Sequence, residues 1–546
     1  MGTKDLLLVA ICATGLAVVA SIVVDAGGSR RNHLPFPPRD AAFQGTVERV
    51  DHTFRQAWQS AGVSPSVRAA DLAIARRLSL SLTGTIPSLE EIRRFEQQPA
   101  EGRIDWWLAR LLADRRCSDY LAERFARAYV GVEDGPFLLY RRRRFVAWLS
   151  ESIHQNRPYD AVVRDLIADT GLWTDRPATN FITVAMIPET NYPDPDKLAV
   201  RVCRSMLGLR IDCAQCHDHP FDDRWTQRGF QSLAAYFGST EQGLSGIYEA
   251  KRPYKVEDYK SGEQVTIEPD VPFDGHLLPD EGTLRQRLAG WVTHPDNRAF
   301  ARATVNRMWT LLFARPLVEP LDDIPLGEPR PDQPEQIVLD RLADEFAGSG
   351  YDLHRLIRLI AATEVFRLES RAIAVSGDAA ELTDVQLHSW AAFPLTRLRP
   401  EQVVGGLLQS VSLTTVDYHS HILRRIIKVI GQQEFVERYG DVGENELTSG
   451  GGTIPQRLLM LNGKLVDERT DSNPLMNAAT RIAMLAPTDE SAVETAYLAV
   501  LTRRPTTAES GYFTEQLTGP EEDARSDKLG DLYWALLNSS EFSYHH

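Results

Sequence analysis

The sequence predicts a mainly α-helical protein, in which two helical lobes are joined by a small β-containing insert. First, apolar residues recur at helical spacing from about Val47 to residue 238. Second, residues 239–283 alternate polar with β-branched or aromatic side chains, which is typical of short strands. Third, helical spacing returns from Thr283 onward. A chain of 546 residues, 43% apolar and 25% charged, fits a globular protein with more than one core.

Apolar stripes and one capping signal mark the helices of the first lobe. The run DLAIARRLSLSL from Asp71 forms one apolar stripe, made by Leu72, Ala75, Leu78 and Leu82. Ser88 and Glu91 have the spacing of a capping box, in which each side chain bonds to the other residue's backbone amide. The runs WWLARLLA from Trp106 and FVAWLS from Phe145 also read as helices.

The second lobe shows equally clear helix boundaries. The run VLDRLADEFAGSG has one apolar face, made by Val338, Leu339, Leu342 and Phe346. Gly348 or Gly350 is expected to end this helix, because glycine tolerates the left-handed backbone of a helix C-terminus. Asp352 is expected to cap the next helix, DLHRLIRLI.

The N-terminus predicts export. Leu6 to Val24 contains no charged residue, and its nineteen residues approach the ~20 that span a bilayer. We interpret residues 1–28 as a signal or, more specifically, an uncleaved anchor, and residues 29–44, rich in Gly and Pro, as a linker. A buried core helix is the alternative, but the segment is terminal and a loose linker follows it. The protein body is therefore expected to be extracytoplasmic and held at the membrane.

The remaining chain divides into three parts. Residues 45–238 are expected to form an N-terminal helical module that contains a cysteine cluster. Residues 239–283 form the β-containing insert, and residues 284–546 form a C-terminal helical module. With a net charge of −15 and no basic face, the chain predicts no nucleic-acid partner. Five cysteines are too few for a disulfide scaffold.

The cluster that carries chemistry is Cys213-Ala-Gln-Cys216-His217, the spacing at which haem c is attached. Two thiols on one turn can add to the two vinyl groups of a porphyrin, and the adjacent imidazole can then face the iron. Cys213 and Cys216 are thus predicted as thioether anchors and His217 as the proximal iron ligand. Haem c is attached outside the cytoplasm, in agreement with the predicted export. The expected work is electron transfer or extracytoplasmic redox chemistry, with a redox partner protein.

Two other interpretations of the cluster stay open. Cys213, Cys216, His219 and Asp222 could hold a zinc or iron ion and serve a metal-dependent, possibly hydrolytic, enzyme. No second C-x-x-C and no H-x-x-x-H supplies the usual distant ligand pair. Alternatively, the cysteines form a disulfide or two buried thiols in a cell-surface structural or interaction module. Met186 and Met206 are the nearest methionines that could ligate a haem iron on its other face.

Several segments together resemble the planctomycete-type, two-module extracytoplasmic proteins of unknown function, which often occur fused to a cytochrome-c module. The resemblance in the first module is carried by ARRLSLSLTGTIP (75–87) and LGLRIDCAQCHDHPFDDRWTQ (207–227). In the second module it is carried by VNRMW (305–309), SGYDLHRLIRLI (349–360), IPQRLLMLN (454–462), RRPT (503–506) and LLNSSEF (536–542). The family has no assigned activity. This chain has one C-x-x-C-H and no appended cytochrome module, so a redox role rests on Cys213 to His217 alone.

Two local features qualify these predictions. Pro220, three residues after His217, would interrupt a helix that continued from a haem turn, which keeps the metal-site interpretation open. In VNRMW, Asn306 and Trp309 share a helix face, and Arg307 points elsewhere. We interpret VNRMW as a packing element between lobes, in which Asn306 and Arg307 satisfy buried backbone groups, over a role in binding substrate or propionate.

Overall fold

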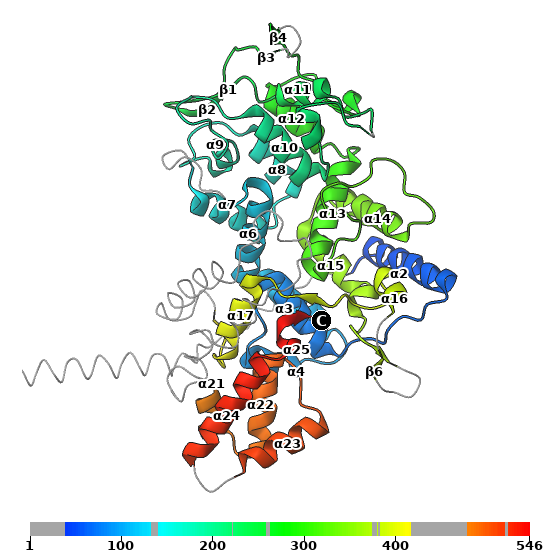
Figure 1. Cartoon of the computed structure of the whole chain (residues 1–546), viewed down its shortest axis with the longest axis vertical. Coiled ribbons are helices and arrows are strands. Elements are labelled where there is room, and N and C mark those ends of the chain that lie inside the picture. The colour runs from blue at the N-terminus through cyan, green and yellow to red at the C-terminus, as the bar shows by residue number, and fades with distance from the viewer. Residues whose placement is uncertain are drawn as a thin grey trace, which may run out of the picture.

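The computed structural model describes residues 39–132, 140–220, 222–257, 262–373, 379–380, 383–416, 478–518 and 522–546. Over these residues the chain is mainly helical, with small two-stranded sheets near 240–266, which confirms the predicted fold class (Figure 1). The predicted signal or anchor segment, residues 1–28, lies outside the described residues. Within the described ranges, no helix is long and apolar enough to cross a membrane.

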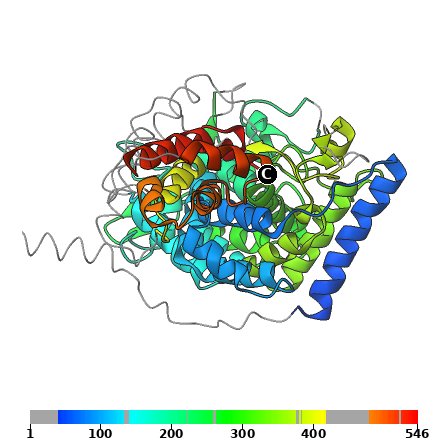
Figure 2. The ribbon, with the colours of Figure 1, turned by 90° about the horizontal axis from the view of Figure 1, so that it is seen from below.

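The helices of the first half build the body of the molecule. They are α2 (Ala41–Ala61), α3 (Asp71–Thr83), α4 (Leu89–Glu96), α5 (Arg103–Ala113), α6 (Arg115–Val130), α7 (Arg142–His154), α8 (Tyr159–Ala168), α9 (Asn180–Thr183), α10 (Pro195–Val202) and α11 (Gln227–Ala234). Helix α2 begins before residue 45, because the Asp40 carboxylate accepts a hydrogen bond from the Phe43 amide and caps it. Figure 2 shows α2, in dark blue, along one edge of the molecule.

The second half contains α12 (Leu284–Val292), α13 (Arg298–Phe313), α14 (Pro334–Gly348), α15 (Leu353–Ala362), α16 (Asp384–His388), α17 (Pro400–Ser410), α21 (Ala478–Leu485), α22 (Asp489–Leu501), α23 (Thr507–Leu517), α24 (Glu522–Leu537) and α25 (Ser540–Ser543). Short single turns are η1 (Pro177–Thr179), η2 (Cys203–Leu207), η3 (Asp212–Gln215), η4 (Gly275–Leu277) and η5 (Val365–Arg367).

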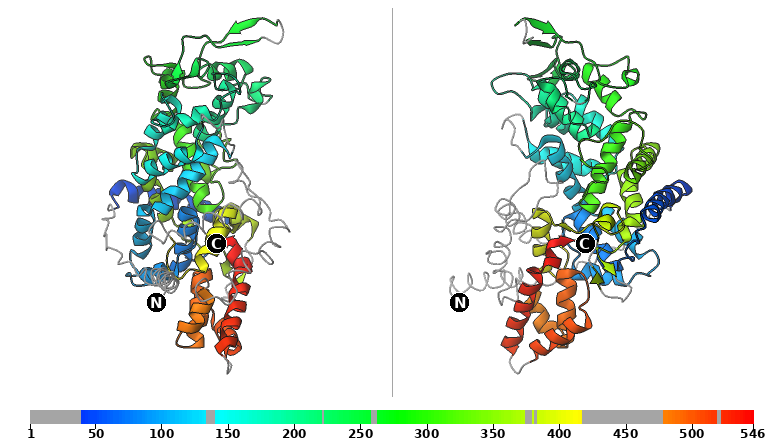
Figure 3. Two further views of the ribbon diagram at one scale, coloured as in Figure 1. Left: turned by 90° about the vertical axis from the view of Figure 1, so that its left-hand side faces the viewer. Right: turned by 45° about the vertical axis from the view of Figure 1, so that its right-hand side comes forward.

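The strands form antiparallel pairs. In the predicted insert, β1 (Thr240–Gly243) pairs with β2 (Gly246–Glu249), and β3 (Lys255–Glu257) pairs with β4 (Gln264–Thr266). Elsewhere, β5 (Ala372–Ile373) pairs with β6 (Ala379–Ala380), and β7 (Thr396–Arg397) pairs with β8 (Tyr544–His545). Figure 3 shows the β3–β4 hairpin at one end of the molecule, opposite the end formed by α22, α23 and α24.

The predicted capping signals are confirmed where they can be compared. Ser88 accepts a hydrogen bond from the Glu91 amide, and Glu91 accepts one from the Ser88 amide, which completes the capping box of α4. Asp352 caps α15 by accepting from the Arg355 amide. Helix α14 ends at Gly348, and Gly350 adopts the left-handed backbone, with φ at 75°.

Buried apolar side chains form two clusters that do not follow the order of the chain. The first runs from Phe43 to Phe393 and draws on helices before and after the β-containing insert. The second joins residues between Leu398 and Phe542 to Leu80 and Ile86. Helix α3 contributes side chains to both clusters: Leu78 and Leu82 pack in the first cluster, and Leu80 packs in the second.

Two buried arginines of α3 donate hydrogen bonds to backbone carbonyls in the two clusters. Arg76 donates hydrogen bonds to the carbonyls of Val500 and Phe542, which belong to the second cluster. Arg77 donates to the carbonyls of Phe366 and Leu368, in the first cluster. Burial lowers the pKa of Arg76 to about 10 and that of Arg77 to about 9, so both stay charged at neutral pH. Each guanidinium thus satisfies carbonyls that would otherwise be buried without a donor.

Helix α13 is the centre of the first cluster. The Asn306 amide group donates to the Val318 carbonyl at 2.8 Å, and its oxygen accepts from the amides of Leu317 and Val318 at 3.0 and 3.1 Å. Arg307 donates to the Ser205 carbonyl at 3.5 Å. The Trp309 ring stacks on Phe313, with 4.3 Å between ring centroids. These contacts confirm that VNRMW is a packing element.

Strand β8 buries a histidine that makes stability depend on pH. His545 is 1% exposed, and its Nε2 lies 3.1 Å from the Ser81 hydroxyl. Burial, reinforced by Arg77 and Arg399, lowers the pKa of His545 well below its usual 6.5. The unfolded chain takes up a proton near pH 6.5, whereas the folded chain does not, so the free energy of unfolding falls as pH drops below 6.5.

We expect His545→Gln to remove this contribution. Below pH 6.5, the wild type should lose up to about 1.4 kcal/mol of unfolding free energy per pH unit more than the variant loses. Denaturant unfolding between pH 7.5 and 5 measures the difference. His388→Gln, at an exposed position on α16, is the control and should follow the wild type. Parallel curves for wild type and His545→Gln would contradict the prediction.

Candidate functional site

The C-x-x-C-H segment lies on the short stretch between α10 and α11, toward the end of the molecule that carries the β3–β4 hairpin (Figure 1). The motif is preceded by η2, which ends at Leu207 and is followed by Gly208, whose φ of 64° is left-handed. A side chain at Gly208 would also come within 2.9 Å of Ile324, so the position requires glycine. Ile211 and Ala214 are buried and fasten the η3 turn to the core.

Both cysteines of the motif are free thiols on the exposed side of this turn. Cys213 lies within η3 and Cys216 directly follows it, and the Cys216 amide donates to the Cys213 carbonyl at 3.3 Å. Both side chains are exposed and neither is in a disulfide, so the interpretation as a disulfide or two buried thiols is wrong for this structure. Cys117 and Cys203, by contrast, are buried, and burial raises the pKa of each thiol far above its usual value. Among the described cysteines, Cys213 and Cys216 are therefore the pair that a reagent or cofactor in solvent can reach.

His217 has one ring nitrogen bonded to the backbone. Its Nδ1 lies 2.8 Å from the Asp218 carbonyl oxygen, and a carbonyl can only accept, so Nδ1 carries the proton. In the neutral ring, the lone pair then resides on Nε2. The side chain is exposed, and a backbone carbonyl on the other ring nitrogen is the partner that usually orients a metal-bound histidine.

The residues after His217 lead the chain into α11 instead of extending a helix. The Asp218 carboxylate accepts from the Gln227 amide at 2.8 Å, and Thr226 caps α11 by accepting from the Gly229 amide. The His219 amide donates to the Trp225 carbonyl at 2.8 Å and closes a loop around Pro220. Pro220 therefore lies in a loop, where its missing N–H costs nothing.

Asp222 is engaged by a neighbouring cation. Arg224 donates to both oxygens of the Asp222 carboxylate, the shortest of these contacts being 2.7 Å. This pairing lowers the pKa of Asp222 to about 2. An ion bound by Cys213, Cys216, His219 and Asp222 would compete with Arg224 for the carboxylate. Within the described part of the chain, no group of three or more His, Cys, Asp or Glu side chains is placed to hold a metal ion.

A second set of contacts ties the turn to the β-containing insert. The Gln215 amide group donates to the Asp196 carboxylate at 3.4 Å, and the Tyr254 hydroxyl donates to the other oxygen of Asp196 at 3.0 Å. Sequence reasoning missed Asp196 and Tyr254, because they lie 19 and 39 residues from Gln215 and no local pattern links them.

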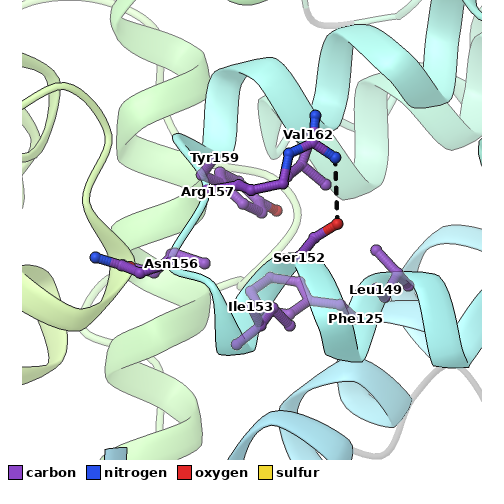
Figure 4. Close-up of a pocket in the computed structure, with 9 residues that line it drawn as sticks. Phe125, Leu149, Ser152, Ile153, Asn156, Arg157, Tyr159 and Val162 are labelled. Atoms are coloured by element: carbon purple, nitrogen blue, oxygen red, sulfur yellow. Dashed lines mark hydrogen bonds between the residues drawn. The ribbon is translucent and has the colours of Figure 1, made fainter. Parts of the chain in front are cut away.

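Two hollows are lined by described residues. One, of about 230 Å³, lies beside the motif and is lined by Ile211, Ala214, Arg224, Trp225, Thr226, Gly229, Phe230, Leu233 and Pro272. The other, of about 280 Å³, lies where α7 is followed by α8, and there Arg157 donates to the Ser152 hydroxyl (Figure 4). Its lining is mostly apolar and it holds no group of nucleophiles or carboxylates. These volumes include open solvent, and the enclosed space of each hollow is only about 10 Å³, room for about one water molecule and far below the ~300–1,000 Å³ of a typical ligand pocket.

The residues present fit attachment of haem c on the surface of the turn. One exposed thiol lies within the short turn η3 and the other directly follows it, and an exposed imidazole whose Nδ1 is bonded to a carbonyl is the next residue. Met186 and Met206 are 6% and 1% exposed, so both belong to the core rather than to this surface.

Two family models match the chain on either side of the insert. Residues 49–242 match PSCyt2, described as "Protein of unknown function (DUF1549)", and residues 284–426 match PSD1, described as "Protein of unknown function (DUF1553)". These matches confirm the resemblance to the planctomycete-type two-module proteins, and the motif lies in the first match. The name PSCyt2 suggests a cytochrome-like domain. No curated protein and no solved structure matches the chain.

Proposed function

We propose that this chain, which belongs to the planctomycete-type proteins that combine the DUF1549 and DUF1553 domains, is a haem-c-type protein. It would be exported, anchored by residues 1–28, and active in electron transfer or extracytoplasmic redox chemistry with a partner protein. With a net charge of −15, its partner is not a nucleic acid.

One observation carries the proposal. Cys213 and Cys216 are exposed free thiols on and directly after one short turn, and the Nδ1 of His217 is already bonded to the Asp218 carbonyl. This arrangement offers two solvent-exposed sulfurs and one nitrogen lone pair within five consecutive residues. In a purely structural turn, neither the two sulfurs nor the imidazole nitrogen would need to be exposed to solvent.

The chain's own residues would each do a separate task. The two thiols would form the thioether bonds, and His217 would supply one axial nitrogen, with its proton kept on Nδ1 by the Asp218 carbonyl. Ile211 and Ala214, both buried, hold the turn against the core so that the sulfurs do not move apart. When bound, a haem of this kind supplies one-electron chemistry.

The metal-enzyme interpretation has less support. The Asp222 carboxylate, its only acidic ligand, has both oxygens bonded to Arg224. Binding an ion there would first have to break this pair, which is a cost that haem attachment at Cys213 and Cys216 does not incur.

A reduced pyridine haemochrome spectrum tests the proposal. The full chain is produced in a host with c-type maturation, and its spectrum is compared with those of Cys216→Ala and Cys203→Ala. We expect a c-type band in the wild type, a shift toward the band of a haem with one unreacted vinyl group in Cys216→Ala, and no change in Cys203→Ala. Cys203 is the matched control because its thiol is buried.

A colourless wild type, made beside a control cytochrome that matures normally, would overturn the proposal. Elemental analysis of the same sample would then distinguish a zinc or iron site from a turn that holds no cofactor.

A further inference from the structure

We infer that Asp196 and Tyr254 are positioning residues for the C-x-x-C-H turn, and that the β-containing insert serves to hold this turn through them. The inference rests on the proposed function for its purpose, but the contacts that carry it belong to the chain itself.

Asp196 accepts hydrogen bonds from two segments that are far apart in the sequence. It stands in the first turn of α10, where the Asp194 carboxylate caps the helix by accepting from the Asp196 and Lys197 amides. One Asp196 oxygen accepts from the Tyr254 hydroxyl at 3.0 Å and the other accepts from the Gln215 amide at 3.4 Å. Asp196 therefore joins the insert to Gln215, one of the two residues between Cys213 and Cys216.

The hydroxyl, the backbone carbonyl and the ring of Tyr254 each contact a different part of the chain. Its hydroxyl is bonded to Asp196, and its carbonyl accepts from the Ile267 amide at 2.9 Å. Its ring lies over Gly238, where a side chain would come within 2.4 Å of Tyr254. Arg252 donates to the carbonyl of Gly238 at 2.9 Å and adds a further tie between the insert and the end of α11. A tyrosine fixed in this way can set the position of the carboxylate it bonds.

The contacts continue through the motif toward α11. The Gln227 side chain donates to the Gln215 carbonyl at 3.4 Å, and the Gln227 amide donates to Asp218 at 2.8 Å. Asp218 is also the residue whose carbonyl orients His217. A path of contacts thus runs from the insert, through Asp196, to Gln215 inside the C-x-x-C-H segment and to His217 at its end.

Burial also affects the protonation of this pair. Asp196 is half-buried, and burial raises its pKa above the usual value. Tyr254 is also half-buried, and burial beside Asp196 raises the pKa of its hydroxyl. The hydroxyl proton therefore stays on Tyr254 and donates to the carboxylate at neutral pH.

Hydrogen exchange on the full chain without haem tests the positioning. We expect Tyr254→Phe and Asp196→Ala to raise the exchange rate of the amides at 213–217 by about three- to tenfold. Asp196→Asn should stay near the wild type, because the asparagine oxygen can accept from Tyr254 and its amide can face the Gln215 oxygen. Tyr248→Phe is the matched control, since its hydroxyl donates to Glu241 at 2.9 Å elsewhere in the same insert.

Haem-loaded protein gives a second readout that a merely structural role would not change. We expect mass spectrometry to find a higher ratio of singly to doubly attached haem in Tyr254→Phe and Asp196→Ala than in the wild type or Tyr248→Phe. Unchanged exchange at 213–217 in Tyr254→Phe, or an equal rise in Tyr248→Phe, would overturn the inference. A wild type without haem would overturn the proposed function instead, and the exchange rates would still decide whether Asp196 and Tyr254 position the turn.

Discussion

Replacing His217 with alanine should leave the haem covalently attached and change its native spectrum. The thiols of Cys213 and Cys216 remain, so the pyridine haemochrome band should persist, because pyridine supplies both axial ligands in that assay. Without pyridine, the iron would lack the imidazole ligand that we propose, whose Nδ1 is bonded to the Asp218 carbonyl. We expect altered native absorption and a midpoint potential shifted on the order of 0.1 V or more, since axial ligands tune haem potentials over ~0.8 V.

Free imidazole should restore the native spectrum of His217→Ala, because the exposed position leaves room for a small ligand. His219→Ala is the matched control, two residues along the same loop. Its backbone amide bonds to the Trp225 carbonyl and would survive the substitution. A changed spectrum in His219→Ala with a normal one in His217→Ala would assign the ligand to His219 and refute His217.

Replacing Asn306 with leucine should destabilise the protein by about 3 kcal/mol or more. Leucine has nearly the same size but cannot bond to the backbone. The Leu317 amide, the Val318 amide and the Val318 carbonyl would then lose their partners inside the first cluster. Each buried polar group left without a partner costs about 1 to 3 kcal/mol.

Guanidinium unfolding followed by tryptophan fluorescence measures this loss, since Trp291, Trp309 and Trp390 are buried in the same cluster. Asn191→Leu is the matched control, at an exposed position, and should change the unfolding free energy by no more than ~0.5 kcal/mol. Equal unfolding midpoints for Asn306→Leu and the wild type would show that the 317–318 segment does not depend on Asn306.

Prediction from the sequence succeeded where the signal lies within a few residues. The apolar spacing of VLDRLADEFAG predicts α14, and the Ser88–Glu91 spacing predicts the start of α4. The alternation after residue 239 predicts the hairpins. Each of these signals acts over one or two helical turns or one pair of strands, so a single stretch of sequence contains it whole.

Prediction failed where the outcome depended on which neighbour a side chain meets. The sequence offered Asp222 as an alternative metal ligand and did not indicate its pairing with Arg224, two residues along the chain. Two arginines of α3, placed in the sequence beside an apolar stripe, are buried and donate to the carbonyls of residues 366, 368, 500 and 542. Residue type alone does not show that these arginines face inward, because arginine is usually exposed.

The sequence by itself determined the helices, their caps, the β-containing insert and the chemical identity of the Cys213–His217 motif. Only the tertiary structure decided that both thiols face solvent, that the proton of His217 lies on Nδ1, and that Asp196 and Tyr254 hold the turn. The physical reason is the separation in sequence over which each interaction acts. Periodicity and capping are local, whereas exposure and hydrogen-bond partners depend on segments such as 196 and 254 that meet only when the chain has folded.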